Sequence, residues 1–361
     1  MKRRKFLGNA VAAASGVAAL SAPGVVRAAR ELTMVTTWPK NLPGTDVAAR
    51  NFARNVELMS GGELRITVYS SGELVPPFES FDAVSSGTAD MYHGAEYYWQ
   101  GKSKALNFFT TVPFGMSATE MDAWILHGGG QALWDELSAQ FNLKALPAGN
   151  TGVQMGGWYN KEINTPDDLK GLKIRMPGLG GETLRRIGAA VTTLPASEIF
   201  AAFESGAIDA TEWIGPWNDL AFGLHKVAKY YYYPGFHEPG PTLSLGINKD
   251  VWEGLGEGHK TIVREASLAE NNRVLAEFNA RNAEALIVLR DTHSVAFRRF
   301  NDDILNAVGA VAGEVVREVG EESELSARIL KSFLDFRRQS MAWTRVADHS
   351  FWASRLLPFE Y

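Results

Sequence analysis

Two stretches of the chain repeat one short pattern, and this internal repeat constrains the fold more than any other feature. Residues 79–90 and 198–209 share six identical residues at identical spacing, 119 residues apart. Each copy predicts a helix that ends at a glycine and is followed by an aspartate before a strand. The repeat predicts two lobes that use the same helix–turn–strand corner. The alternative is a chance match of common residue types.

Strands and helices alternate along the first part of the chain, which predicts an α/β fold. Residues 32–37 and 64–69 have the pattern of strands, and a helix is predicted between them over 45–59. A further helix over about 77–84 and a short strand around Met91 continue the alternation. Such a pattern is typical of a largely parallel sheet covered by helices.

The chain is too long for a single hydrophobic core, so more than one domain is expected. Small, flexible residues over 148–152 follow a predicted strand and separate a first lobe, 30–150, from a second lobe, 151–239. The chain then returns to the first lobe, which residues 240–258 complete. Two crossings between lobes make a hinge and leave a cleft. Residues 259–361 are predicted to form a long helix and a helical C-terminal extension.

Residues 1–29 have the features of an export signal. Four consecutive cations precede Phe6-Leu7, a weakly apolar run follows to Val26, and small residues surround Arg27. The pattern resembles a twin-arginine signal that is removed near residues 28–29, which predicts a periplasmic protein. The alternative is a disordered basic tail or a membrane anchor, although no stop-transfer stretch follows.

Net charge and the lack of cysteine exclude several classes of function. The formal net charge is −5, and it becomes −10 without residues 1–29, which carry five cations and no acid. Such a chain has no general attraction for nucleic acid or anionic membrane surfaces, so an anionic ligand needs a local cation. The absence of cysteine excludes disulfides, thiolate metal sites and cysteine nucleophiles, so a large core must supply the stability.

Arg175 is the strongest candidate for that local cation. Apolar and basic residues alternate over 172–176, which predicts a strand, and Pro177-Gly178 ends it before a glycine-rich helix start. Open α/β sheets bind ligands at the carboxyl ends of their strands, and a planar guanidinium group matches a carboxylate. The alternative is an exposed strand arginine paired with an acidic residue.

Three segments of the second lobe, 169–175, 194–198 and 204–209, carry a family resemblance, together with 86–90 of the first lobe. They resemble the solute-binding proteins of tripartite ATP-independent periplasmic (TRAP) transporters, the DctP family. The resemblance covers nearly the whole chain after residue 29. Glu212-Trp213 and the run 156–159 are similar to the subgroup that takes 2-oxo acids and other small monocarboxylates. The resemblance implies a two-lobed periplasmic binding protein that delivers a pyruvate-like 2-oxo acid to the membrane subunits of the transporter.

The resemblance also implies how the ligand is held. Arg175 is expected to clamp the ligand carboxylate, with Gln154, Glu212 and Trp213 across the same cleft. A metal cation, with sodium favoured over calcium, is expected to bind the Gln154 amide oxygen, the Glu212 carboxylate, the Trp213 carbonyl and Glu238. Charge balance supports a hard cation independently, because Glu212 beside an anionic ligand would otherwise repel it. The alternative for Glu212 is a solvated acid at a strand end.

Aromatic residues offer walls for such a cleft. Tyr97 and Tyr98 follow the predicted strand near residue 91, and one of them is expected to close over the ligand. Phe108-Phe109 and Trp217 are further candidates for apolar walls, and Asn150 at the hinge is a candidate polar contact. Core packing is the alternative for each ring.

Two enzyme classes remain as alternatives to a binding protein. A twin-arginine signal often accompanies periplasmic oxidoreductases, and a secreted carboxylate-processing hydrolase is a weaker candidate. The sequence has neither a His-Glu-x-x-His zinc motif nor a Gly-x-Ser-x-Gly turn nor a Walker lysine. We therefore predict that the protein is not an enzyme.

An apolar stripe near the C-terminus predicts a helix with one buried face. The stripe contains Ile329, Leu330, Phe333, Leu334 and Phe336. Related monocarboxylate binders exchange a C-terminal helix within a dimer, so the resemblance implies a homodimer through this helix. The alternative is a helix that packs on its own lobe.

Overall fold

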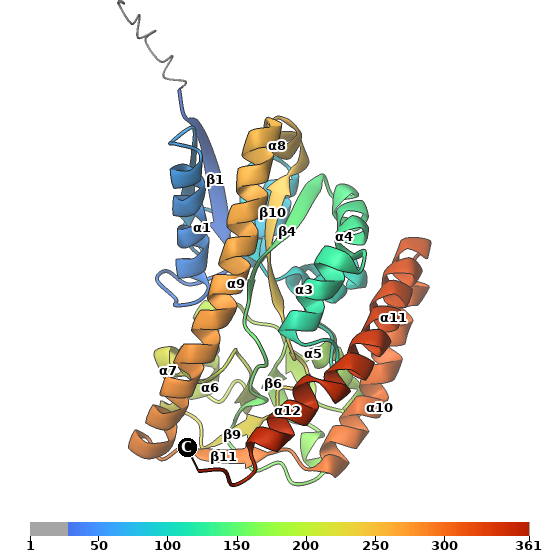
Figure 1. The fold of residues 1–361 in the computed structure, drawn as a ribbon. Helices are drawn as coiled ribbons and strands as arrows, with labels where there is room; N and C mark the ends of the chain where they lie inside the picture. Colours follow the sequence, from blue (N-terminus) through green and yellow to red (C-terminus); the bar gives the residue numbers. More distant parts are fainter. Residues whose placement is uncertain (1–27, 361) are drawn as a thin grey trace, which may run out of the picture.

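The computed structural model describes residues 28–360, so the predicted export signal lies outside the described residues apart from Ala28 and Ala29. Two sheets organise the described chain, one in the upper half of Figure 1 and one in the lower half. The strand order is β2-β1-β3-β10-β4 in the first sheet and β11-β9-β5-β8-β6-β7 in the second. The predicted α/β fold with two lobes is confirmed.

The first sheet contains β1 (Arg30–Thr36), β2 (Leu64–Tyr69), β3 (Met91–Gly94), β4 (Leu143–Asn150) and β10 (Thr242–Asn248). The second contains β5 (Gly157–Tyr159), β6 (Lys173–Arg175), β7 (Ala190–Thr192), β8 (Ala210–Thr211), β9 (Tyr230–Tyr233) and β11 (Ala296–Arg299). The α-helices are α1 (Asp46–Met59), α2 (Ser80–Ser85), α3 (Ala118–His127), α4 (Gly130–Ala139), α5 (Gly178–Ile187), α6 (Ala196–Glu204), α7 (Pro216–Phe222), α8 (Lys249–Glu253), α9 (Glu257–Ile287), α10 (Asp302–Glu318), α11 (Glu324–Val346) and α12 (Asp348–Arg355).

The sequence repeat is also a repeat of structure. β1 pairs in parallel with β2 and β3, and β6 pairs in parallel with β7 and β8, so the same β-α-β-α-β unit occurs in each sheet. In the first copy the Asp90 carboxylate accepts the backbone N–H of Thr33 at 2.7 Å. In the second copy the Asp209 carboxylate accepts the N–H of Lys173 at 3.2 Å. Each aspartate thus ties the start of one strand to its parallel neighbour.

Each sheet contains one strand that runs against all the others. β10 is antiparallel to β3 and β4, and β5 is antiparallel to β8 and β9. The prediction of a largely parallel sheet therefore holds for all but one strand of each. We propose residues 30–150 with 240–258 as the first lobe and 151–239 as the second, because the strands of each sheet other than β11 fall within these ranges.

The long helix α9 packs against both lobes. Val263 and Ala266 lie in the core of the first sheet, whereas Val274 and Phe278 lie in the core of the second. Figure 1 shows the helix running the length of the molecule beside both sheets. The helix α9 therefore packs against both lobes along its length. Between residues 28 and 360, no helix combines the length and the apolar content that crossing a bilayer requires.

Residues 259–361, predicted as a long helix and a helical C-terminal extension, also contain the short strand β11. This edge strand pairs with β9 in parallel. Two of its four residues, Arg298 and Arg299, are arginines that point to solvent and form ion pairs with Glu162 and Asp302. A short polar edge strand has too little alternation to be recognised from its sequence.

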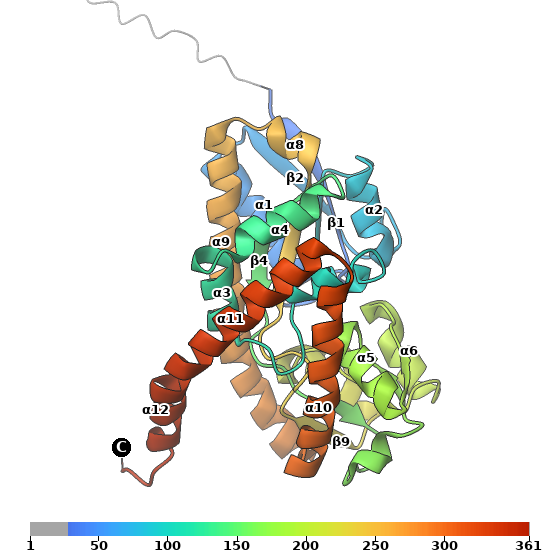
Figure 2. The ribbon, with the colours of Figure 1, turned by 90° about the vertical axis from the view of Figure 1, so that its right-hand side faces the viewer.

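The C-terminal stripe packs on its own chain. Ile329 and Phe333 on α11 are buried in the core that also contains Trp124 and Phe108, and Leu330, Leu334 and Phe336 pack against it. These five residues therefore follow the packing alternative. Figure 2 shows α12 continuing beyond the end of α11, away from the sheets. Apolar residues along this end are exposed, including Trp343, Phe351 and Leu356.

Candidate functional site

The site begins at the carboxyl ends of β6 and β8. Arg175 is the last residue of β6, and Glu212 directly follows β8, its parallel neighbour. Because parallel neighbours end at the same edge of a sheet, the two side chains meet. Both are fully buried. Arg175 is therefore not the exposed strand arginine that the sequence left open as an alternative.

Arg175 is held from several directions. Its Nη1 forms an ion pair with Oε1 of Glu212, and its Nε donates to the carbonyl oxygen of Leu194 at 3.1 Å. The guanidinium carbon lies 5.5 Å from the ring centroid of Trp213, which allows a cation–π contact. Burial is the largest single effect and opposes the positive charge, but Glu212, Tyr98, Tyr97 and Glu238 together outweigh it and the pKa of Arg175 is raised. Arg175 is thus a fixed cation whose Nη2 has no hydrogen-bond partner among the described residues.

Three potential metal ligands lie next to this cation. Glu212, His237 and Glu238 each place one ligand atom within 4.8 Å of the others, and all three are buried. Nε2 of His237 lies 3.3 Å from Oε2 of Glu212. Burial, followed by repulsion from Glu212, raises the pKa of Glu238 well above its usual range. A bound cation would supply the opposite charge that lets both carboxylates ionise together.

Unpaired oxygen atoms point to a ligand or cation at this place. Oε2 of Glu238 and Oε1 of Gln154 are buried and have no hydrogen-bond partner within residues 28–360. The backbone N–H of Gln154 donates to the carbonyl of Glu238 at 3.1 Å, so the two segments are adjacent. Buried polar atoms are rarely left unpaired, and oxygen atoms are the ligands that sodium and calcium prefer. The donor set therefore fits a hard cation.

The first lobe contributes aromatic rings to the same place. Tyr97 and Tyr98 lie on a short 3₁₀ helix, Glu96–Trp99, directly after β3. Burial raises the pKa of Tyr98 to about 12, with a smaller opposing effect from Arg175. The pKa of Tyr97 is also raised by burial and then by Glu238. Both tyrosines thus remain neutral beside the charged groups of the second lobe.

Contacts between the lobes enclose these residues. Oδ1 of Asn107 in the first lobe accepts the backbone N–H of Leu179 in α5 at 3.2 Å. Nδ2 of Asn218 in α7 donates to the carbonyl of Pro43 at 3.1 Å. Because the lobes touch at both places, the structure is that of a closed cleft.

The chain matches the family described as bacterial extracellular solute-binding protein, family 7, over residues 34–323. A curated relative, a monocarboxylate 2-oxoacid-binding periplasmic protein of a Nostoc species, is 39% identical over 97% of this chain and 98% of its own length.

The chain belongs to this family.

The resemblance to TRAP transporter receptors is thereby confirmed for this family 7 solute-binding protein. A TRAP solute-binding protein of Pseudoalteromonas atlantica, with bound sodium and pyruvate, is 39% identical with a TM-score of 0.88 over 92% of this chain and all of its own. A second, from Bordetella bronchiseptica, is 34% identical with a TM-score of 0.89 over 91% of this chain and 97% of its own. The Bordetella protein is a mixed-occupancy dimer with calcium and picolinate in one active site.

Several of the residues that the sequence analysis assigned to the cleft lie together in the structure of this chain. Arg175, Gln154, Glu212 and Glu238 lie together, with Trp213 against Arg175. Their roles as ligand and metal contacts, including that of the Trp213 carbonyl, stay predictions.

Other candidates have different surroundings. The Asn150 amide donates to the carbonyl of Gly240 at 3.1 Å and accepts the N–H of Gly152 at 2.9 Å, so it holds the two lobe crossings together. Its geometry lends no support to a ligand contact. Phe108 and Phe109 lie in the core of the first lobe, and Trp217 packs against Phe278 of α9 at 5.3 Å. These rings follow the core alternative.

Two residues were missed by the sequence analysis. Trp38, two residues beyond the end of β1, lies 6.3 Å from Trp213 and 6.4 Å from Tyr98 between ring centroids. Its position just beyond a strand end was the signal that could have found it. His237 was set aside with the other scattered histidines, although it precedes the candidate ligand Glu238.

Proposed function

We propose that this chain is the extracytoplasmic receptor of a TRAP transporter that binds a small, pyruvate-like 2-oxo acid together with a metal cation in the cleft between its lobes. It would deliver this ligand unchanged to the membrane subunits of the transporter, working in the periplasm after removal of residues 1–29. One observation carries the proposal. A buried, fixed guanidinium group lies beside two buried carboxylates, and the unpaired oxygen atoms of Glu238 and Gln154 lie in the same region.

The two ligands of the solved relatives support this ligand class. In pyruvate and picolinate the carbon next to the carboxylate is bonded to a second donor atom, a keto oxygen or a ring nitrogen, so each can chelate a cation while its carboxylate meets a guanidinium group. Gln154, Glu212 and Glu238 would hold the cation here, and it would neutralise the charge that two carboxylates and an anionic ligand place in one cleft. Arg175 would bind the ligand carboxylate from the other side.

With Glu238 protonated, charge counting favours sodium over calcium. Arg175 and Glu212 cancel, so an anionic ligand needs one further positive charge, which sodium supplies. Ionised Glu238 would add one negative charge and move the balance to calcium. Ligand binding favours the closed cleft only to the extent that the ligand contacts both lobes, and the tyrosines of the first lobe supply those contacts.

Titration of pyruvate into chelator-treated protein tests the proposal. We expect binding in sodium buffer, little binding without either cation, and at least a hundredfold loss in Arg175→Lys, because a lysine has no planar fork. Arg185→Lys, on the exposed part of α5, is the matched control. Equal affinity of both variants for pyruvate, or full affinity without any cation, would overturn the proposal.

We also propose a homodimer through the C-terminal end of the chain. Its support is the group of exposed apolar side chains on α11 and α12, which includes Trp343, Phe351, Trp352 and Leu356. Light scattering at micromolar concentration should give the mass of two chains, and Phe351→Ser/Trp352→Ser should give the mass of one. A single-chain mass for the unchanged protein would contradict this.

A binding protein and an enzyme differ in what happens to the ligand. The curated relative and the solved neighbours named above are solute-binding proteins, which supports a receptor rather than the alternatives of an oxidoreductase or a carboxylate-processing enzyme. Pyruvate incubated with the protein should raise its melting temperature and be recovered unchanged. Formation of any product would support an enzyme.

A further inference from the structure

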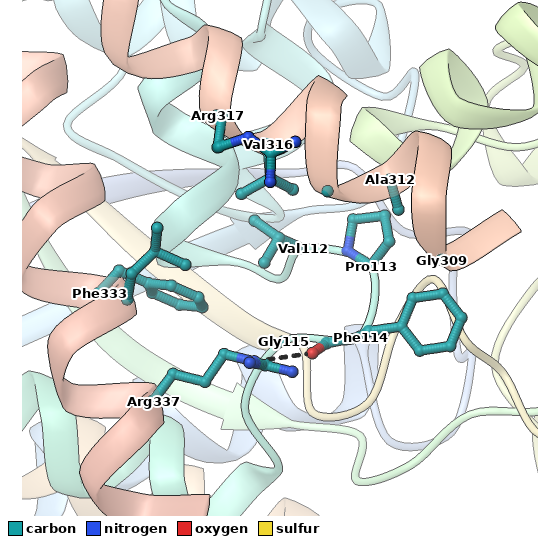
Figure 3. Close-up of a pocket in the computed structure, with 12 residues that line it drawn as sticks. Val112, Pro113, Phe114, Gly115, Gly309, Ala312, Val316, Arg317, Phe333 and Arg337 are labelled. Carbon is teal, nitrogen blue, oxygen red and sulfur yellow. Dashed lines mark hydrogen bonds between the residues drawn. The ribbon is translucent and has the colours of Figure 1, made fainter. Parts of the chain in front are cut away.

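A second cavity lies outside the cleft, between α10, α11 and the loop 112–115. Its volume is about 260 Å³. Most of its wall is apolar and contains Val112, Pro113, Phe114, Ala312, Val316 and Phe333. Gly309 and Gly313, four residues apart on α10, keep the space open because neither has a side chain to fill it. Figure 3 shows the cavity with these groups around it.

Two guanidinium groups line this apolar cavity. Arg317 comes from α10 and Arg337 from α11, and Figure 3 shows them on opposite sides of Val112 and Phe333. Nε of Arg337 donates to the carbonyl of Phe114 at 2.9 Å. Within the described part of the chain, no carboxylate lies within 4.0 Å of either guanidinium group. Of the neighbouring acids, Glu318 is paired with Arg186, and Asp335 is paired with Lys331 and Arg338.

We propose that this cavity is a second ligand site, for an amphipathic carboxylate with a short apolar tail. Either guanidinium group can pair with the single negative charge of the head group, and the apolar wall matches the tail. A group the size of water occupies about 30 Å³, so the cavity takes about nine of them, which is close to the size of hexanoate. Pyruvate is smaller and has no apolar tail to cover the wall.

The cavity is connected to the cleft through Phe114. The backbone N–H of Phe114 donates to the carbonyl of Phe236 at 2.7 Å, and the two rings stack at 5.8 Å. Phe236 directly precedes His237 and Glu238. Phe114 has a φ of +53°, which an L residue keeps only when its surroundings hold it. A carboxylate that draws Arg337 away from the Phe114 carbonyl would loosen this segment.

Hexanoate binding tests the site directly. We expect isothermal titration to show binding to the full chain, at least tenfold weaker binding in Arg317→Gln, and at least tenfold weaker binding in Gly313→Leu, whose side chain fills the cavity. Arg338→Gln, the neighbour of Arg337 with an exposed side chain, should bind normally. Hexanol, which has the tail without the charge, should bind at least tenfold more weakly.

Three results would overturn the site. They are no hexanoate binding to the unchanged protein, equal binding by Arg317→Gln and Gly313→Leu, and a dimer that Gly313→Leu converts to a monomer without any hexanoate binding. The last result would make this surface an interface between two copies of the chain. An unchanged melting temperature in the variants shows that they fold.

The connection to the cleft rests on the proposed function and is tested separately. Saturating hexanoate should change the affinity for pyruvate at least threefold, and Arg317→Gln should abolish that change. Unchanged pyruvate affinity with hexanoate bound would overturn the connection. Failure of pyruvate to bind under either condition would contradict the proposed function, whereas hexanoate binding is measured independently of it.

Discussion

In the first lobe the strand after Asp90 leads to His93, and in the second lobe the strand after Asp209 leads to Glu212, three residues further on in each case. Both residues are buried at the same edge of their sheets. Burial lowers the pKa of His93 to about 4, so this imidazole is neutral. It accepts the indole N–H of Trp38 at 2.7 Å. Glu212 is instead the partner of Arg175 and a candidate metal ligand.

The difference teaches that the repeated corner is a scaffold and carries no chemistry of its own. One lobe uses the residue three positions after the aspartate to orient an aromatic ring, and the other uses it to hold a charge. Closure then brings neutral rings against a charged surface, so that the charged groups described at the cleft belong to the second lobe. Such a division suits a small anion that is bound by one lobe and covered by the other.

The largest expected effect comes from removing one partner of the buried ion pair in the second lobe. Glu212→Leu leaves Arg175 buried without its partner, and we expect about 3–5 kcal/mol of lost stability in urea denaturation, with no pyruvate binding. The double variant Arg175→Met/Glu212→Leu removes both charges and should recover most of the stability without recovering binding. If the double variant is as unstable as Glu212→Leu, the lost stability comes from packing and not from an unpaired buried charge. The contrast between a charged and a neutral lobe would then not explain the stability.

A buried acid in the first lobe gives the next largest effect. Burial raises the pKa of Glu96 from 4.5 to about 7. The native state therefore binds this proton more tightly than the unfolded state, and the stabilisation is present below pH 4.5 and lost as the pH rises through about 7.

We expect Glu96→Gln to remove this loss. The unfolding free energy of the unchanged protein, relative to that of the variant, should fall by about 3 kcal/mol between pH 4 and pH 8. The Tyr92 hydroxyl, which donates to Glu96 at 2.8 Å, keeps an acceptor in the variant. Parallel pH profiles of the two proteins would contradict the prediction.

The contact between the lobes sharpens the comparison further. Asn107→Ala removes the acceptor for the N–H of Leu179 and should shift the protein towards an open cleft. We expect about tenfold weaker pyruvate binding, equivalent to about 1.4 kcal/mol, without loss of the charged site. Asn279→Ala, on the exposed part of α9, is the matched control. Scattering curves that show equal closure of both variants with pyruvate would contradict this role.

The smallest effect is expected from the aromatic half. Trp38→Phe keeps a ring in the cleft but loses the hydrogen bond to His93, and pyruvate binding should weaken about threefold to tenfold, as for the loss of one hydrogen bond. Trp252→Phe, in the first lobe and remote from the cleft, should leave the affinity unchanged. A loss in Trp38→Phe as large as that in Glu212→Leu would remove the distinction between the lobes.

Short-range patterns were enough for much of the fold. The strand over 64–69 is as predicted to the residue, and the helix predicted over 45–59 begins at Asp46. The repeat at 79–90 and 198–209 forms matching corners because a helix stop, a left-handed glycine and an aspartate act within one turn of chain. The position of Arg175 near a strand end followed from alternation and from the Pro177-Gly178 stop.

Long-range contacts decided the rest. Alternation could not show that β11 joins the second sheet, that Phe108 and Phe109 lie in a core, or that the amide of Asn150 is used by the hinge.

The candidate site also depends partly on short-range sequence patterns and partly on long-range contacts. The sequence by itself placed Arg175 and Glu212 at strand ends and, through its charge, required a local cation for an anionic ligand. Only the tertiary structure brought His237 to Glu212, and set Trp38 of the first lobe against Trp213 of the second. The physical reason is that periodicity reports which face of an element is buried. Which distant element covers that face depends on two chain crossings and on closure of the lobes.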